Sequence, residues 1–381
     1  MTADLTAGRD RRVAAELAER GCDALLVTGL VNVRWLCGFT GSNAAALVGA
    51  DGFAGEPEAA AADPGAAEVD GIRLFATDFR YLTVSAEQVP ERWETVIHQD
   101  LLEALIDRLG PDVRRLGFDD AQMSVRDHRR LAELCGQDIE LVPAGGLVED
   151  LRAVKDRHEL ERIAAAALLA DAALTEVLER GIVGRTEVEV ALELEVAMRR
   201  LGAEGISFPP IVASGAHGAL PHAEPRDVPI PPDTLVVIDW GAQLDGYASD
   251  CTRTFATGPL SDHDASIYAL VLEAQEASLA AVRAGHLGRE VDAVARDIIT
   301  AAGHGDHFGH GLGHGVGLEV HEGPRLSRLG ETALAPSMVV TVEPGVYVPG
   351  VAGVRIEDLV VVTDDEPQVL SSLPKSLRLV H

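Results

Sequence analysis

VVIDWGAQLDGYASDCTRTF, residues 236–255, is the stretch of this chain that decides its fold. Asp239 closes the apolar run 235–238, and further along the chain Glu343 closes the similar run 339–342. Both runs are typical of buried strands. An ionised carboxylate at the end of a buried strand loses hydration at a large cost unless a partner or a metal replaces the water. We therefore expect a cation at these strand ends.

Three more segments continue the pattern: HFGHGLGHGVGLEVHEGP (307–324), VVTVEPGVYVPG (339–350) and GVRIEDLVVVT (353–363). A lone Asp after a strand is commonly a turn or cap residue, a lone His is more often structural than a ligand, and Glu343 before Pro344 could open a turn. Together, however, the segments supply hard ligands with enough negative charge for two divalent cations, which indicates hydrolytic chemistry. The expected ligands are Asp239, Asp250, His314, Glu343 and Glu357.

In order and spacing, these segments resemble the metal-dependent pita-bread peptidases, the family of methionine aminopeptidase, aminopeptidase P and Xaa-Pro dipeptidase. The shared patterns are D-x-G-A, D-G-Y-x-S-D-x-T-R-T-F, H-G-L-G-H-G-V-G-L-E-V-H-E-G-P, T-V-E-P-G and G-V-R-I-E-D. The resemblance implies an α+β protein in which an N-terminal α/β domain precedes a pita-bread catalytic domain with a curved antiparallel sheet. We place the creatinase/prolidase-like N-terminal domain at 1–145 and the catalytic domain at 146–381.

The resemblance also implies roles for single residues. Asp250 and Glu357 would join both metals, and Glu343 would in addition move the proton from the nucleophile to the leaving nitrogen. His222 and His321 would face the substrate without binding metal. For His222 the ordinary alternative is an exposed loop histidine.

Two further residues are expected to be catalytic by resemblance. His310 matches a third active-site histidine of the proline-specific branch, and its alternative is a histidine that supports His314. Arg355 would steady the carboxylates, or would simply form an ion pair with Glu357. His304 and His307 match no position of the pattern and are expected at the surface.

The N-terminal half of the sequence indicates which branch of the family this chain resembles. Thr28-Gly29, Gly38-Phe39-Thr40-Gly41-Ser42 and Thr77-Asp78-Phe79-Arg80-Tyr81 resemble the start of the Xaa-Pro dipeptidase and aminopeptidase P branch. Methionine aminopeptidases lack such a domain. We expect hydrolysis of the bond preceding proline in Xaa-Pro dipeptides or short N-terminal Xaa-Pro peptides, with dipeptides favoured. Alternatives are an amidohydrolase acting on a small non-peptide amide such as ectoine, and a metal-free binding module on the same fold.

The expected cofactors are two divalent ions, Mn²⁺ or Co²⁺, with Zn²⁺ as an alternative, because oxygen ligands with one imidazole suit them. Two such ions about 3.5–4 Å apart would share and activate a water. Proline has no N–H and a fixed φ, so its ring needs a shaped pocket, for which His310 is the candidate. Its free carboxylate in a dipeptide needs a cation, and Arg325 and Arg328 are candidates.

Composition agrees with two soluble domains: 381 residues, 47% of them hydrophobic and 24% charged. A net charge of −29 opposes binding to nucleic acid and to anionic membranes. No long apolar run and no secretory pattern at the start are evident, so a cytoplasmic protein is expected. Four cysteines without paired spacing are expected to be reduced. The resemblance also implies a homodimer.

Local signals predict several further features. Asp156 with Glu159, Thr186 with Glu189 and Ser261 with Asp264 predict helix starts, and Leu160, Ile163, Ala167 and Leu168 are expected on one helix face. Residues 51–70, rich in Ala, Glu and Pro, predict a mobile loop. The chain departs from the family pattern at Ser337, where glycine is usual, and at His217, where asparagine is usual. If Ser337 has a positive φ, it costs stability, on the order of 1 kcal/mol.

Overall fold

The computed structural model describes residues 5–50 and 71–381, so the expected loop at 51–70 lies outside the described residues. The chain forms two compact units, Met1–Arg152 and Ala153–His381. Helix α6 (Leu147–Ala153) follows the expected boundary at 145/146 but is held by the first unit. Its Glu149 accepts a hydrogen bond from the side chain of Asn32, and its Arg152 donates one to the same side chain.

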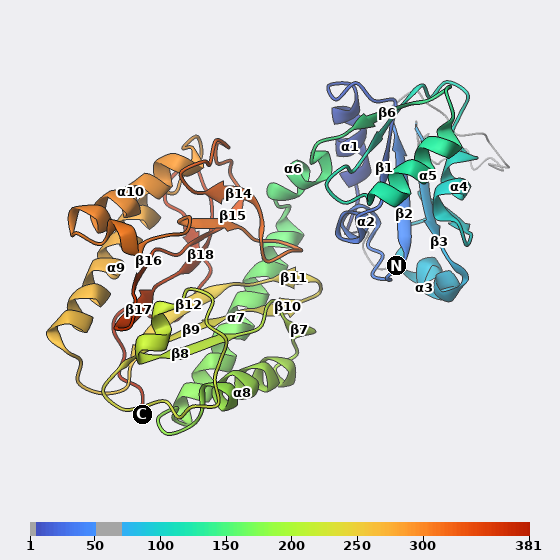
Figure 1. Ribbon diagram of the computed structural model, residues 1–381. Coiled ribbons are helices and arrows are strands. Elements are labelled where there is room, and N and C mark those ends of the chain that lie inside the picture. Colours follow the sequence, from blue (N-terminus) through green and yellow to red (C-terminus); the bar gives the residue numbers. More distant parts are fainter. Residues whose placement is uncertain (1–4, 51–70) are drawn as a thin grey trace. The chain divides into compact units, whose positions relative to one another are not determined.

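The first unit is a six-stranded mixed sheet in the order β4-β3-β2-β1-β5-β6, with helices between the strands (Figure 1). Strand β1 pairs in parallel with β5 and antiparallel with β2. The strands are β1 (Ala24–Val27), β2 (Ala44–Gly49), β3 (Arg73–Thr77), β4 (Glu94–Ile97), β5 (Arg115–Phe118) and β6 (Glu140–Pro143). The helices before α6 are α1 (Arg9–Leu17), α2 (Leu30–Cys37), α3 (Leu82–Gln88), α4 (Leu101–Ile106) and α5 (Val125–Cys135).

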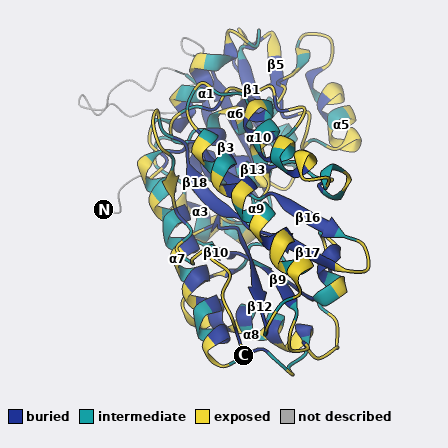
Figure 2. Cartoon of the chain, turned by 90° about the vertical axis from the view of Figure 1, so that its left-hand side faces the viewer, coloured by how far each residue is buried: buried dark blue, intermediate teal, exposed yellow. Residues whose placement is uncertain are grey.

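Burial explains the composition of the central strands. Every residue of β1, β2 and β3 is buried, and β1 and β2 are apolar runs without alternation, as expected where both faces of a sheet are covered. In β3 the buried Arg73 pairs with Asp10 at 2.7 Å. Figure 2 shows strands in the dark blue of buried residues and helices that carry yellow, exposed faces. The first unit is thus an α/β layer structure, as expected.

Four long helices frame the second unit: α7 (Arg157–Glu179), α8 (Glu187–Arg200), α9 (Asp262–Ala281) and α10 (Gly288–Ala301). The predicted starts are confirmed, because Asp156 and Thr186 form capping boxes and the Ser261 side chain accepts from the Asp264 N–H. The predicted face of α7 is wrong at Leu168, which is 56% exposed. Ile163 and Ala167 of that face are buried as predicted, and the buried stripe continues through Ala166 and Ala170.

Every strand pair of the second unit is antiparallel, as expected for its fold. One half contains β7 (Gly205–Ile206), β8 (Ile211–Ser214), β9 (Leu235–Trp240), β10 (Ala242–Leu244), β11 (Tyr247–Ala248) and β12 (Cys251–Ala256). The other half contains β13 (Gly313–Gly315), β14 (Glu322–Leu326), β15 (Val339–Val342), β16 (Gly345–Val348), β17 (Ala352–Arg355), β18 (Asp358–Val361) and β19 (Gln368–Val369).

Each half of the second unit has its own helix pair. Helices α7 and α8 pack on the sheets of the first half, and α9 and α10 pack on those of the second half (Figure 1). The buried apolar residues form one cluster under each helix pair. Ser337 has φ 69°, so the strain expected at this non-glycine position is present. No helix of the described residues is long and apolar enough to cross a membrane.

Candidate metal centre and active-site cavity

Five side chains that the sequence singled out as ligands come from strands of both halves of the second unit. Asp239 lies in β9, Asp250 directly precedes β12, and His314 lies in β13. Glu343 directly follows β15, and Glu357 lies between β17 and β18. The backbone N–H of Glu357 donates to the Thr252 carbonyl at 3.0 Å, which fixes this connection against β12. The sheet therefore positions the side chains through backbone hydrogen bonds.

The carboxylates form two neighbouring groups. Ligand oxygens of Asp239, Asp250 and Glu357 lie within 4.8 Å of one another. The His314 Nε2 atom lies 3.2 Å from Glu343 Oε1 and 3.6 Å from Asp250 Oδ2. Asp250 is thus common to both groups. The first group has the spacing of a cation site, and His314 and Glu343 lie beside it.

Burial and mutual repulsion make this cluster electrostatically unfavourable by itself. Burial, and after it neighbouring carboxylates, raise the pKa of Asp250 and of Glu357 well above the usual range. Burial also raises the pKa of Asp239, with Glu343 adding to the rise and Arg355 opposing it. The single arginine of the cluster cannot balance the negative charge of four carboxylates. Divalent cations would supply the missing positive charge.

Single atoms show that divalent cations fit the site. Buried oxygens of two residues, Asp239 Oδ1 and Glu357 Oε1, have no hydrogen-bond partner among the described residues. The His314 Nδ1 atom lies 3.1 Å from the Gly315 carbonyl oxygen and donates to it, which directs Nε2 at the carboxylates. Metal-binding histidines are oriented in this way. Burial alone would lower the pKa of His314, but the hydrogen bond to Glu343 outweighs burial and raises it, so a cation bound here would replace the proton that Nε2 shares with Glu343. The donor set of oxygens with one imidazole suits hard or borderline divalent ions.

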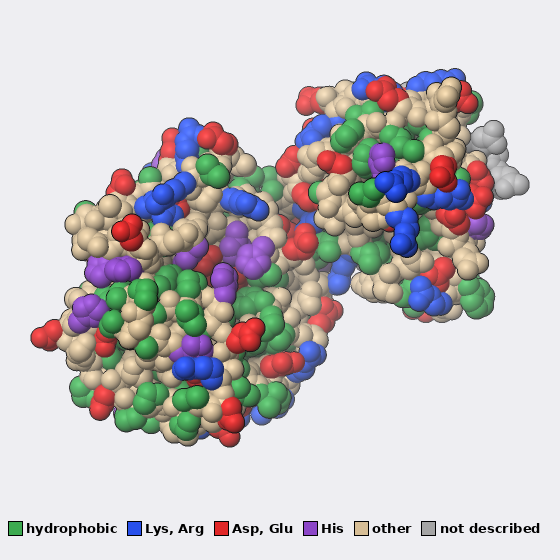
Figure 3. Space-filling model, in the orientation of Figure 1, with side chains coloured by type: hydrophobic (Ala, Val, Ile, Leu, Met, Phe, Trp, Pro, Cys, Tyr) green, Lys and Arg blue, Asp and Glu red, His purple; other side chains and the backbone are tan. Residues whose placement is uncertain are grey.

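A cavity of about 830 Å³ opens over these residues. Figure 3 shows a hollow on one face of the second unit with histidine side chains around it. All three of the expected non-ligand histidines contribute to its wall. The lining includes His222, His310 and His321, together with Phe208, Pro209, Pro210, Glu322, Arg325, Tyr347 and Arg355.

Tyr347 is a cavity residue that the sequence reasoning missed. Its hydroxyl lies 3.0 Å from His310 Nε2 and accepts a hydrogen bond from Arg355 Nη1 at 2.9 Å. The His310 Nδ1 atom lies 2.7 Å from the Gly311 carbonyl, so this nitrogen carries the ring proton and Nε2 accepts from the tyrosine. Burial lowers the pKa of His310, in agreement with a neutral ring. His310 thus contacts Tyr347, and no hydrogen bond joins it to His314 among the described residues.

Arg355 pairs with Asp239 and not with Glu357, which corrects one expectation. Its Nη2 atom lies 2.6 Å from Asp239 Oδ2, its Nε donates to the Thr252 hydroxyl, and Nη1 donates to the Pro221 carbonyl as well as to Tyr347. Thr252 in turn donates to Glu357 Oε2 at 2.8 Å. Arg355 therefore orients the carboxylates directly and through Thr252.

His321 packs beside the ligand candidate His314, with ring centroids 4.3 Å apart. Burial, and after it the neighbouring His314, lower the pKa of His321, which favours a neutral ring. The next residue, Glu322, pairs with Lys155 at 2.5 Å, and both side chains are almost inaccessible. Lys155 is one of two lysines in the chain and was not singled out from the sequence. The pair fixes the start of β14 next to His321.

Of the two arginines considered for a substrate carboxylate, Arg325 lines the cavity and Arg328 does not. Arg325 is exposed, and its side chain makes no hydrogen bond or ion pair among the described residues. His304 and His307, expected at the surface, do not line the cavity and are half-buried, with their Nδ1 atoms 3.0 Å apart.

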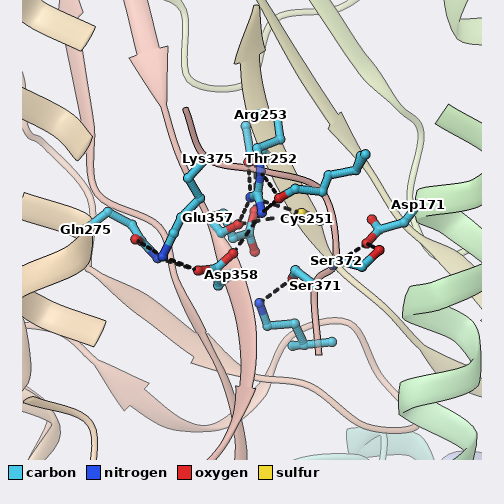
Figure 4. Close-up of polar contacts among 12 residues, drawn as sticks. Asp171, Cys251, Thr252, Arg253, Gln275, Glu357, Asp358, Ser371, Ser372 and Lys375 are labelled. Carbon is cyan, nitrogen blue, oxygen red and sulfur yellow. Dashed lines mark hydrogen bonds and ion pairs between the residues drawn. The ribbon is translucent and has the colours of Figure 1, made fainter. Parts of the chain in front are cut away.

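A buried polar network surrounds Glu357 and its neighbour Asp358 (Figure 4). Arg253 donates to the Glu357 carbonyl and pairs with Asp358 at 2.8 Å. Lys375 and Gln275 also bond to Asp358. The network fixes the backbone that carries Glu357. Cys251 lies beside it as a free thiol, and the other three cysteines are free and buried too.

Comparison with known proteins agrees with this geometry. Residues 161–364 match the model of metallopeptidase family M24, and residues 9–154 match the creatinase/prolidase N-terminal domain. The chain belongs to metallopeptidase family M24. A Bacillus subtilis (strain 168) protein named "Uncharacterized peptidase YqhT" is 40% identical over 94% of this chain and 96% of its own length.

Other relatives carry more specific names. The "Xaa-Pro dipeptidase" of Pyrococcus furiosus is 44% identical over 61% of this chain and 66% of its own length. Among solved structures, "Xaa-Pro dipeptidase from Bacillus anthracis" has a TM-score of 0.89 and 37% identity, covering 98% of this chain and 99% of that one. The X-Pro aminopeptidase of Thermotoga maritima has a TM-score of 0.83 and 34% identity, covering 94% and 98%.

Proposed function

We propose that this M24 protein hydrolyses the peptide bond preceding proline, with Xaa-Pro dipeptides as its preferred substrates. The observation that carries the proposal is one cavity that combines carboxylates of the cluster, four histidines and Arg325, which has no partner among the described residues. The names of the Pyrococcus furiosus and Bacillus anthracis relatives support it. None of the relatives described above is named for action on ectoine, so the amidohydrolase alternative has no support.

The residues proposed to hold two divalent ions are Asp239, Asp250, His314, Glu343 and Glu357, with Asp250 and Glu357 shared. When bound, Mn²⁺ or Co²⁺, with Zn²⁺ as the alternative, would supply Lewis acidity and lower the pKa of a bound water. Arg355 holds Asp239 in place, and Thr252 holds Glu357. These contacts set the direction of the carboxylates before a cation arrives.

Glu343 is the proposed proton carrier. Burial alone would raise its pKa, but the hydrogen bond and charge of His314 outweigh burial and lower the pKa of Glu343 to about 2. An ionised Glu343 can accept a proton from the attacking water and pass it to the nitrogen of the leaving proline. The rings of His321 and His222 would donate hydrogen bonds to the oxygen of the scissile carbonyl as it becomes negative.

Proline enters the cavity as a leaving group with a ring and no N–H. Phe208, Pro209 and Pro210 give one part of the wall an apolar character suited to such a ring. His310, which donates to the Gly311 carbonyl and accepts from Tyr347, has no proton left for the substrate. We assign it to shaping the wall and orienting the Tyr347 hydroxyl.

The dipeptide preference follows from the two cavity arginines. Arg355 is fully engaged with Asp239, Thr252, Tyr347 and Pro221. Arg325 has no partner among the described residues and is therefore free to pair with the carboxylate of a C-terminal proline. A tripeptide Xaa-Pro-Yaa lacks that carboxylate at the proline and would lose this contact.

Turnover of Xaa-Pro dipeptides, Xaa-Pro-Yaa tripeptides and ectoine, with and without added Mn²⁺, tests the proposal. We expect hydrolysis of the dipeptides, no activity after chelation, and recovery with Mn²⁺ or Co²⁺. Full activity after metal removal, verified by elemental analysis, would exclude the metal mechanism. Preferred turnover of ectoine would exclude the substrate class.

Arg325→Ala and the matched control Arg328→Ala refine the same assay. Arg325→Ala should raise KM for dipeptides by about 10-fold or more, as expected for loss of a charged hydrogen bond, and should change tripeptide turnover little. Arg328→Ala, outside the cavity, should leave the dipeptide KM and the tripeptide turnover unchanged.

The homodimer stays a prediction, which the molar mass from light scattering will test.

A further inference from the structure

Glu187 is a fully buried carboxylate outside the cavity. It is the first residue of α8, and its side chain is 0% exposed. A buried carboxylate is unfavourable unless hydrogen bonds replace its hydration. Burial alone would raise the pKa of Glu187, but bonds from Arg226 and Ser214 outweigh burial and lower the pKa to about 2. Glu187 therefore remains an ionised acceptor at neutral pH.

The donors to Glu187 come from both ends of one loop, residues 214–226. At its start, the Ser214 N–H and hydroxyl both donate to Oε1 at 2.8 Å. His217 Nδ1 lies 3.0 Å from Oε2 and donates to it. At its end, Arg226 donates its N–H and Nε to Oε2 and its Nη2 to Oε1, each at 3.0 Å. The Glu187 side chain thus joins both ends of the loop, and the Val188 N–H adds a backbone bond to the Arg226 carbonyl at 3.2 Å.

The segment between these ends forms part of the cavity wall, from Pro221 to Pro225. Its only side-chain bond to the opposite half of the unit, among those found in the described residues, runs from Arg355 Nη1 to the Pro221 carbonyl at 3.1 Å. His222 is exposed to the cavity, and its ring makes no hydrogen bond among the described residues. No hydrogen bond to the ring helps to place this side chain, so the backbone of the loop determines where it enters the cavity. His217, where asparagine is usual, contacts Glu187 and does not line the cavity.

We propose that Glu187 is a positioning residue that places His222 against the substrate by closing the 214–226 loop. The proposal rests on the proposed role of His222 as a donor to the reacting carbonyl. A displacement of about 1 Å at a reacting group can cost up to about 100-fold in rate. Loss of the Glu187 charge should therefore act on catalysis through His222, with little effect on the metal cluster.

A double-mutant cycle of Glu187→Gln and His222→Ala tests this coupling. The amide in Glu187→Gln would keep the volume of the side chain but present an NH₂ group to donors. We expect kcat for an Xaa-Pro dipeptide to fall about 10- to 100-fold in Glu187→Gln, with KM and metal content near wild type. In the His222→Ala background the same substitution should change kcat by less than about 2-fold, because the residue it positions is already gone.

Additive effects in the cycle would overturn the proposal, as would a folded Glu187→Gln protein with wild-type kcat. If Glu187→Gln does not fold, Arg226→Ala takes its place, since the Arg226 side chain is 45% exposed and its loss removes part of the same contact. Arg200→Ala is the matched control, because it breaks an exposed pair between α8 and Glu176 of α7 and should leave kcat unchanged.

Hydrogen exchange read by mass spectrometry separates this inference from the proposed function. Exchange in peptides covering 214–226 should rise in Glu187→Gln and in Arg226→Ala, whatever the substrate of the enzyme is. Unchanged exchange there would contradict the closed loop even if proline peptides are cleaved. Raised exchange in a protein that cleaves no Xaa-Pro peptide would contradict the proposed function and leave the loop contact standing.

Discussion

Two segments bring histidines to the same cavity and hold them in different ways. Residues 308–321 carry His310, His314 and His321, and the first two have a ring nitrogen bonded to a backbone carbonyl of their own segment. The 214–226 loop carries His222, whose ring has no hydrogen bond among the described residues. One segment orients histidines through their side chains, and the other orients its histidine through the backbone.

The anchors of the two segments are nevertheless alike. Arg296 of α10 donates to the carbonyls of Phe308 and His310 at 3.0 and 2.8 Å, and Asp292 accepts from the Leu312 N–H. Glu187 and Arg226 have the corresponding role for the 214–226 loop. In each case the histidine segment is bound by a carboxylate–arginine pair. Both members of the pair Asp292–Arg296 lie on α10, and Glu187 of the other pair lies on α8. The comparison suggests that ring contacts, and not backbone anchors, distinguish the two sides.

The largest effects are expected within residues 308–321, where two neighbouring rings should fail differently. His314→Ala should lower metal occupancy together with rate. His321→Ala should keep its metal and lose about 10²- to 10³-fold in kcat, as for loss of one donor to the developing oxyanion. Elemental analysis and steady-state kinetics measure both. Loss of metal from the His321 variant, or a near-normal kcat, would show that its assigned role is wrong.

The strands and the carboxylate cluster could be predicted because both are visible in short stretches of sequence. The runs 235–238 and 339–342 are apolar since both faces of β9 and β15 are covered, and the residues that end them are charged. Helix starts were predicted because a capping box lies within four residues of sequence. Leu168 was placed on the wrong face of α7 because apolar residues at the surface are common and carry no periodic mark.

Residues whose partners are distant in sequence escaped prediction. Glu187 bonds to Arg226, Lys155 to Glu322, and Tyr347 to His310, each across a long stretch of chain. A single Glu, Lys or Tyr in a helix start or strand has an ordinary explanation, and nothing nearby in the sequence marks its partner. Such pairs become visible when the fold brings the segments together.

An intermediate effect is expected from Tyr347→Phe, which tests the ring contacts of residues 308–321. The substitution removes the hydroxyl that joins His310 to Arg355. Loss of a hydrogen bond with a charged donor costs about 1.5–3 kcal/mol, so kcat/KM should fall about 10- to 100-fold. The matched control is Tyr268→Phe, whose hydroxyl donates to the Lys375 carbonyl. Equal effects of the two substitutions would argue against a role for the Tyr347 contact in catalysis.

The smallest effect, and one on stability instead of rate, is expected at the anchor of the 214–226 loop. The pKa of Glu187 is lowered from 4.5 to about 2 in the folded protein. A carboxylate with a depressed folded pKa stabilises the protein fully above its unfolded pKa, and this contribution is lost as pH falls toward the folded value. The wild type should therefore lose its advantage over Glu187→Gln in urea unfolding between pH 4.5 and about 2. Glu195→Gln, at an exposed pair with Arg199, should show no such pH-dependent difference. A wild-type advantage that stays constant through that range would mean that the Glu187 charge does not stabilise the loop.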